Sequence, residues 1–170
     1  MILSRPLNFK KMKLKTTYYL LLLVMLPTVS CSSGDSIDKD EQKPTITINY
    51  AEGFPQACAE LTKGQTYIFR AKVADNKALA SYSLDIHNNF DHHTHDDQGI
   101  DCNLESTKQA INPLIFMENF SIENNPTSYE IKITLAIPDD VDPGDYHCQY
   151  SVTDQTGWHS RTSVDIKIVE

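Results

Sequence analysis

Apolar and polar residues alternate along most of the chain from Pro44 onward, which is the period of a strand with one buried face. The clearest segments carry an apolar residue at every second position over all or part of their length: residues 66–75, 81–87, 128–137, 145–154 and 159–169. Residues 45–50 and 114–122 show a weaker form of this pattern. About seven short strands with turn residues between them predict an all-β fold, an antiparallel β-sandwich.

The turn before residues 145–154 carries a more specific signal. Asp142, Gly144, Tyr146 and Cys148 have the D-x-G-x-Y-x-C spacing of the tyrosine corner, which marks strand F of immunoglobulin-like sandwiches. Residues 66–74, 81–87, 128–137 and 159–169 then become strands B, C, E and G. Strand B has no inward cysteine to pair with Cys148, so the disulfide that usually joins the two sheets is absent.

The cysteines after position 31 suggest a different disulfide. Cys58 and Cys102 both fall in predicted loops and are the favoured pair, which leaves Cys148 as a buried free thiol. The sequence is compatible with all three pairings among these cysteines. A bridge from Cys58 to Cys102 would fasten the long loop after residue 87 to the segment before strand B.

The first thirty residues have the features of an export signal. Five Lys and Arg residues precede the apolar run YYLLLLVML, and no acidic residue occurs before Cys31. The run is too short for a spanning helix, which needs about 20 apolar residues. Because TVSC resembles a loose bacterial lipobox, residues 1–30 are predicted to be a lipoprotein signal peptide and Cys31 the lipidation site. The alternative is ordinary cleavage near Ser30, with Cys31 as a thiol.

Residues 31–43 are polar and acidic, which predicts a flexible tether leading to a single domain over residues 44–170. Removing the signal takes away five cations and no acid, which leaves ten Lys and Arg against 23 Asp and Glu, a net charge of −13. Such an acidic chain argues against nucleic acid or an anionic membrane surface as a partner, and mildly favours cations.

Histidines gather in one short stretch, because four of the six fall within HNNFDHHTH, residues 87–95. In the predicted sandwich the end of strand C lies beside the start of strand F, so we expect His87 and His147 to be cross-strand neighbours. The loop that follows adds three more to this pole: His92, His93 and His95. His159, at the start of strand G, belongs to the opposite pole.

Imidazole nitrogens bind Zn, Cu, Ni or Fe ions, and two or three of them with a carboxylate complete a common coordination set. His93 and His95 project to one side of an extended backbone and His92 to the other, so the first two are the better partners for His87 and His147. The carboxylate candidates are Asp91, Asp96 and Asp97. We therefore expect a transition-metal site here, against the alternative of a solvated polar loop.

Two further motifs carry less weight. HTHDD is similar to the H-x-H-x-D motif of metallo-β-lactamase-like hydrolases, but Gln98 stands where that motif has its next His, and the chain lacks the length of that fold. Four acidic residues cluster near the start of strand F without the spacing of an EF-hand, and are interpreted as turn residues: Asp139, Asp140, Asp142 and Asp145.

The motifs IHNNFDHHTH and GDYHCQYSVTDQTGW, with FRAKVADNKALASYSLDI before them, resemble a family of small Bacteroidetes lipoproteins that carry an immunoglobulin-like domain of unknown function. The resemblance covers nearly all of the chain after Cys31 and implies no settled activity. It also implies that the acidic residues after Cys31 direct export to the cell surface, and that DSI at residues 35–37 fits a short O-glycosylation pattern.

The sequence thus supports a leading hypothesis and a competing one. The first is a lipid-anchored, non-enzymatic protein of the cell envelope, in the outer membrane, which binds a transition metal or a metal-containing ligand and serves an uptake system such as a TonB-dependent receptor. The second is an adhesion or assembly module in which the sandwich is a spacer and the histidine pole a protein contact.

Overall fold

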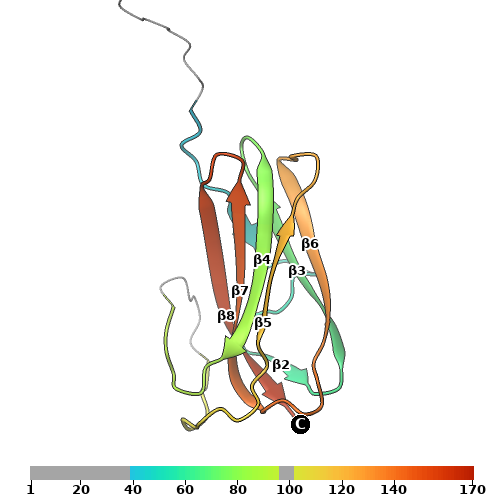
Figure 1. Cartoon of the computed structure of the whole chain (residues 1–170), viewed down its shortest axis with the longest axis vertical. Coiled ribbons are helices and arrows are strands. Elements are labelled where there is room, and N and C mark those ends of the chain that lie inside the picture. Colours follow the sequence, from blue (N-terminus) through green and yellow to red (C-terminus); the bar gives the residue numbers. More distant parts are fainter. Residues whose placement is uncertain (1–38, 96–101) are drawn as a thin grey trace, which may run out of the picture. The chain divides into compact units, whose positions relative to one another are not determined.

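The computed structural model describes residues 39–95 and 102–170 (Figure 1). The described chain forms eight strands and no helix. The strands are β1 (Thr45–Thr47), β2 (Ala59–Thr62), β3 (Thr66–Ala74), β4 (Leu79–Asn88), β5 (Phe116–Ser121), β6 (Ser128–Ala136), β7 (Gly144–Asp154) and β8 (His159–Val169). No helix in this part of the chain is long and apolar enough to cross a membrane. The predicted signal peptide and Cys31 lie outside the described residues.

The strands form two sheets, one with the order β1-β3-β6 and one with the order β2-β8-β7-β4-β5. Strands β3 and β6 therefore share one sheet, and β4, β7 and β8 share the other, as strands B and E and strands C, F and G do in an immunoglobulin-like sandwich. The two sheets lie face to face in Figure 1. The predicted all-β sandwich is confirmed.

The core consists of the apolar residues that alternation placed on the inward faces. Phe69 and Ala71 of β3, Leu84 of β4 and Tyr150 of β7 are all fully buried. Burying a side chain of the size of Phe or Leu stabilises the fold by about 1.5–3 kcal/mol relative to leaving it exposed. Because β3, β4, β6, β7 and β8 each contribute two or more buried apolar residues, the alternation fixes which face of these strands points inward.

The tyrosine corner is present and closes one end of the sandwich. The Tyr146 hydroxyl donates a hydrogen bond of 2.6 Å to the carbonyl of Asp142, four residues upstream. The same oxygen accepts a bond of 3.2 Å from the Leu114 amide, so Tyr146 also ties the segment before β5 to β7. This confirms the assignment of β7 as strand F.

The sequence pattern missed one strand, β2, which is also the strand that pairs in parallel. Strand β2 pairs with β8 in parallel, with Leu61 opposite Ile168. Leu61 is fully buried, but it is the one buried residue among the four residues of β2. Alternation over so short a segment offers too few positions to be recognised.

Strands β4 and β7 run antiparallel and define two poles of the domain. At one end His87 lies opposite His147, and at the other end Leu79 lies opposite Asp154. The predicted pairing of His87 with His147 is therefore confirmed. At about 3.3 Å per residue, the two poles are roughly 26 Å apart along β4.

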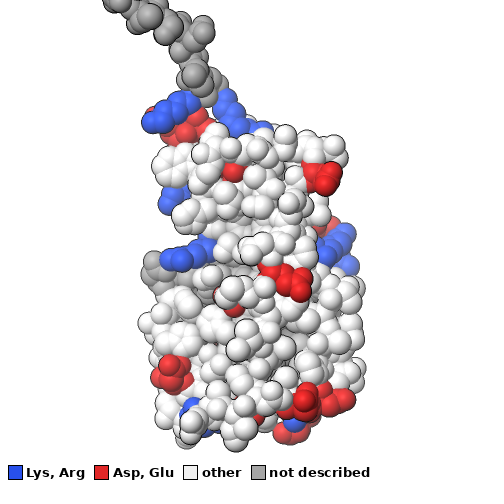
Figure 2. Space-filling view, in the orientation of Figure 1, with Lys and Arg blue, Asp and Glu red and all other residues white. Residues whose placement is uncertain are grey.

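Charged side chains are dispersed over the face shown in Figure 2. Lys and Arg side chains stand apart from one another there and form no continuous basic patch, while several acidic side chains are visible toward the lower end. This face therefore has no concentration of positive charge of the kind that tracks a phosphate backbone.

Candidate metal centre

The backbone after β4 turns sharply and brings the loop histidines back over the strand that they follow. The Asn89 amide donates to the carbonyl of Asp145, and the buried Phe90 packs edge to face against Tyr146. His92 then has a φ of 60°, in the left-handed region, and its amide donates to the carbonyl of Asn89. This turn carries the next residues back toward the end of β4.

Three imidazoles converge at this turn. Nε2 of His87 lies 3.2 Å from Nε2 of His93 and 3.3 Å from Nε2 of His95. One ring nitrogen from each of the three lies within 4.8 Å of those of the other two. The rings of His87 and His93 are stacked, while the ring of His95 meets both edge to face. We refer to His87, His93 and His95 as the histidine triad.

Two rings of the triad each have a carboxylate partner at Nδ1. Nδ1 of His87 lies 2.9 Å from Oδ1 of Asp85, and Nδ1 of His93 lies 2.6 Å from Oδ1 of Asp91. The hydrogen bond from His93 is the main reason why the pKa of Asp91 is lowered from its ordinary value. A ring that donates Nδ1–H to a carboxylate has its lone pair on Nε2, which is the tautomer that binds a metal.

The spacing of the Nε2 atoms matches the edge of a metal coordination polyhedron. Zn–N bonds of about 2.0–2.1 Å in a tetrahedral site place neighbouring ligand nitrogens about 3.3–3.4 Å apart. The two Nε2 separations from His87 are 3.2 and 3.3 Å. A direct N–H···N bond between the rings of His87 and His93, with both rings also donating Nδ1–H to their carboxylates, would require one additional proton on the pair.

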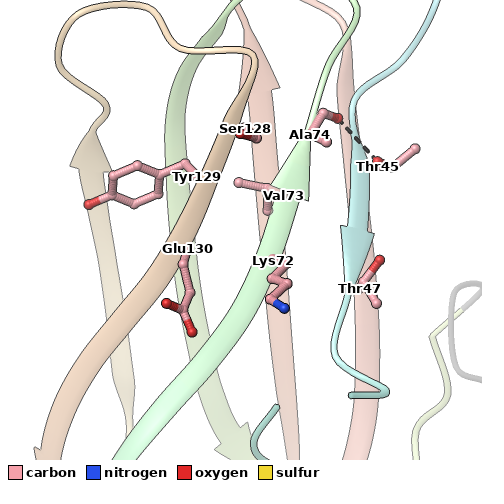
Figure 3. Close-up of a pocket in the computed structure, with 8 residues that line it drawn as sticks. All are labelled: Thr45, Thr47, Lys72, Val73, Ala74, Ser128, Tyr129 and Glu130. Atoms are coloured by element: carbon pink, nitrogen blue, oxygen red, sulfur yellow. Dashed lines mark hydrogen bonds between the residues drawn. The ribbon is translucent and has the colours of Figure 1, made fainter. Parts of the chain in front are cut away.

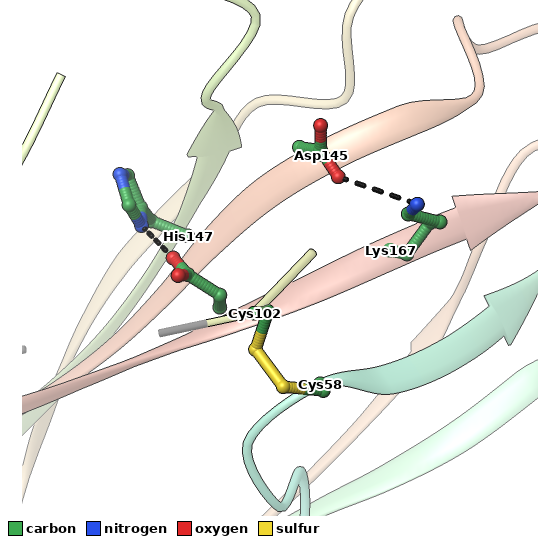
Figure 4. Close-up of a disulfide and its surroundings, with 6 residues drawn as sticks. Cys58, Cys102, Asp145, His147 and Lys167 are labelled. Atoms are coloured by element: carbon green, nitrogen blue, oxygen red, sulfur yellow. Dashed lines mark ion pairs between the residues drawn. A yellow bond between two sulfur atoms is a disulfide. The ribbon is translucent and has the colours of Figure 1, made fainter. Parts of the chain in front are cut away.

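His147 lies beside the triad but faces protein oxygens. Its ring centroid is 4.5 Å from that of His95, 4.8 Å from that of His93 and 5.6 Å from that of His87. Nε2 of His147 lies 3.1 Å from the carbonyl oxygen of His93, and Nδ1 lies 2.7 Å from Oδ1 of Asp165 (Figure 4). In this arrangement His147 supports the loop backbone at His93 and directs neither nitrogen at the triad.

His147 is fully buried, and this burial lowers its pKa from the ordinary value because charging the ring would require desolvating it. The nearby His93 carbonyl and Asp165 carboxylate act in the opposite direction and offset part of the effect. The ring nitrogens of His147 therefore face two oxygens, the carbonyl of His93 at Nε2 and the carboxylate of Asp165 at Nδ1.

The remaining candidates lie around the triad. Asp91 is mostly exposed and reaches His93 from the solvent side. His92 is not part of the convergent set, and its buried Nε2 has no hydrogen-bond partner. Asp96 and Asp97 lie outside the described residues. His159 is exposed and pairs with Thr153 toward the other pole, as predicted.

The loop that carries His93 and His95 is also fastened at its far end. Cys58 and Cys102 form a disulfide with their Cα atoms 5.6 Å apart, so the predicted pairing is confirmed (Figure 4). The Cys58 amide donates to the carbonyl of Asp165, which places the disulfide beside β8. Cys148 is a buried free thiol, also as predicted, and burial raises its pKa well above the ordinary value. A thiol of this kind is a poor metal ligand.

Two hollows in the surface lie apart from the triad. One of about 320 Å³ adjoins the disulfide, and Asp145, Asp165 and Lys167 contribute to its lining. The other, of about 360 Å³, lies over β1, β3 and β6 (Figure 3). Its charged groups are already engaged, because Lys72 lies over the Tyr50 ring and Glu130 pairs with Lys132.

Sequence reasoning missed Asp85 and Asp165 as partners of histidines. A signal for the first was present, since Asp85 and His87 have the same D-x-H spacing as Asp91 and His93. Residues two apart on a strand share a face, so the carboxylate can reach the ring. Asp165 lies opposite His147 on β8, which only the register between β7 and β8 reveals.

Comparisons with known proteins define the family of the chain and add little about its chemistry. No curated protein matches it. Among solved structures, the crystal structure of the sporulation control protein Spo0M from Bacillus subtilis is similar at 10% identity and a TM-score of 0.40, covering 75% of this chain and 49% of that one. The chain therefore spans about half the length of that protein. A family model covers residues 29–169, and the chain accordingly belongs to the family described as a domain of unknown function, DUF4625.

Proposed function

We propose that this protein binds one transition-metal ion through Nε2 of His87, His93 and His95. The observation that carries the proposal is the geometry of these atoms, since the Nε2 separations from His87 of 3.2 and 3.3 Å fit ligands of one metal ion. The carboxylates of Asp85 and Asp91 support it, because outer partners of this kind orient imidazole ligands and raise their basicity.

Three imidazoles leave at least one coordination position for water or an exchangeable ligand. A donor set of neutral imidazoles suits Zn, Cu or Ni, and Fe less strongly, and affinity among the divalent ions is expected to be greatest for Cu. The role we propose is binding and transfer rather than catalysis. It is supported by the position of the triad at the end of a strand, with parts of His87 and His93 exposed, whereas catalytic sites usually lie in concave pockets.

The proposed setting is the cell envelope. The basic head, apolar run and cysteine of residues 1–31 support a lipid anchor at Cys31, and so a place at the outer membrane. A metal-binding protein held there could deliver its ion, or a metal-containing ligand, to an outer-membrane uptake system such as a TonB-dependent receptor.

A second candidate function is adhesion or assembly without a metal. Strand β5 is at the edge of the five-stranded sheet, and Met117 within it and Ile115 before it are exposed to 65% and 69%. Exposed apolar side chains on an edge strand favour pairing with another chain.

Calorimetric titration of the purified, metal-stripped chain without a polyhistidine tag separates the two functions. We expect one Zn ion bound per chain in the wild-type protein, and affinity reduced by more than about 100-fold in His87→Ala and in His95→Ala, since each removes a ligand. His159→Ala, at the other pole, is the matched control and should bind as the wild type does. Equal, small losses in all three variants, or no stoichiometric binding in the wild type, would leave assembly as the better account.

A further inference from the structure

A second convergence of side chains lies at the opposite pole of the domain. Asp40 precedes β1, Asp75 follows β3, and Asp154 is the last residue of β7. One carboxylate oxygen of each lies within 4.8 Å of those of the other two. This pole, at the upper end of Figure 1, is where the β3–β4 and β7–β8 turns lie.

In each of these carboxylates, one oxygen is satisfied and the other is not. Oδ1 of Asp75 accepts from the amides of Lys77 and Ala78. Oδ1 of Asp154 accepts from the amide and hydroxyl of Thr156 and from the Trp158 amide. Oδ1 of Asp40 accepts from the Gln42 amide and the Asn76 side chain. The three Oδ2 atoms are buried and have no hydrogen-bond partner.

Burial makes these unpartnered oxygens costly. Asp40 is 6% exposed and Asp154 is 2% exposed, so water reaches neither freely. Within residues 39–95 and 102–170, no Lys, Arg or His nitrogen forms an ion pair with any of the three carboxylates. Lys43, a cation in the adjoining segment, lies over the Trp158 ring. Buried charges in proteins are normally paired or coordinate a metal ion.

We propose that Asp40, Asp75 and Asp154 bind one divalent cation, and that this cation is calcium. The donors are all oxygen, which a hard cation prefers over the transition metals that imidazole attracts. Three carboxylates exceed the one or two that magnesium usually takes, whereas calcium accepts several, with carbonyl oxygens or water completing its shell. The ion would fasten the segment at Asp40 to the β3–β4 and β7–β8 turns.

The chain carries a built-in reporter for this site. Trp158 is the single tryptophan, its amide donates to Oδ1 of Asp154, and its indole Nε1–H donates to the carbonyl of Asp40 at 3.0 Å. Terbium(III) is similar to calcium in size and ligand preference, and it luminesces when an excited indole close by transfers energy to it. Excitation of Trp158 should therefore report terbium bound at these carboxylates.

The test uses the full chain, purified in a mild detergent and stripped of metal with a chelator. We expect one terbium ion per chain to give saturable emission on excitation of Trp158, calcium to displace it, and calcium to raise the temperature of unfolding. Asp75→Asn should weaken terbium and calcium binding by more than about tenfold, since it removes a charged ligand. Because the amide oxygen can still accept from Lys77 and Ala78, this variant keeps the turn intact.

Two controls separate this site from general acidity and from the histidine triad. Glu123→Gln changes an exposed acid in the β5–β6 turn, and His87→Ala changes the other pole; both should respond to terbium and calcium as the wild type does. Without calcium, Asp75→Asn should be at least as stable as the wild type, because one of three like charges is gone. If terbium emission is the same in wild type and Asp75→Asn, or calcium leaves the unfolding temperature of the wild type unchanged, the proposal is wrong.

Discussion

The disulfide between Cys58 and Cys102 should stabilise both the fold and the metal site. It joins residues that are 44 positions apart. The double variant Cys58→Ser/Cys102→Ser removes it and leaves no unpaired thiol at either of these two positions. In the chain-entropy treatment, closing a loop of about 45 residues lowers the entropy of the unfolded chain by an amount worth about 4 kcal/mol at 25 °C. We expect the free energy of unfolding to fall by about that amount.

Denaturant titration followed by circular dichroism measures this loss, with metal absent. Wild-type protein kept reduced should agree with the double variant, because Cys148 is buried and a reductant changes nothing there. Metal affinity should also fall, since the segment after His95 would lose its covalent tie at Cys102 and would next be held at Glu105, whose amide donates to Oδ2 of Asp145. A loss below about 1 kcal/mol would show that the unfolded chain is not restrained in this way, and unchanged metal affinity would refute the link between the disulfide and the triad.

Other parts of the account can be tested separately. Tyr146→Phe removes the hydroxyl that joins Asp142 to Leu114 and leaves their buried backbone groups unpaired. The free energy of unfolding, measured by denaturant titration, should fall by about 1–3 kcal/mol. An unchanged value would contradict the role of the tyrosine corner. Hydrogen bonds from the amides of Ile111 and Asn112 lower the pKa of Asp142. The stability that this carboxylate contributes should be fully present above the ordinary pKa of about 3.9, and should disappear as the pH falls through the lower pKa of the folded state. Asp142→Asn should flatten that part of the pH–stability curve, and an unchanged curve would contradict the assignment. Cys31→Ser should abolish incorporation of radiolabelled palmitate, whereas labelling that persists in this variant would exclude Cys31 as the lipidation site.

Alternation and one turn motif were sufficient to predict most of the fold. Side chains such as Phe69 and Leu84 had to point inward because they occupy every second position of a strand, and the spacing from Asp142 to Cys148 identified strand F. From these followed the pairing of His87 with His147. Strand β2 was not predicted because only one of its four residues, Leu61, is buried, and a single buried position cannot show an alternating pattern.

The functional sites were harder to predict than the fold, because their geometry depends on backbone turns and on register. The residue type of His147 suggested a ligand, but only the conformation of the loop reveals that its Nε2 faces the carbonyl of His93. The cluster of Asp40, Asp75 and Asp154 left no signal in the sequence at all, since its members are up to 114 positions apart and each resembles an ordinary turn residue.

X-ray absorption spectroscopy of the zinc-loaded protein tests the proposed metal centre most directly. The account predicts three imidazole nitrogens at about 2.0–2.1 Å from the metal, with one further light ligand, and the loss of one imidazole in His95→Ala. His147→Ala should leave the number of coordinated imidazoles at three, because that ring faces the carbonyl of His93 and the carboxylate of Asp165. A shell composed mainly of oxygen, or an imidazole count unchanged in His95→Ala, would contradict the assignment of His87, His93 and His95 as the metal ligands.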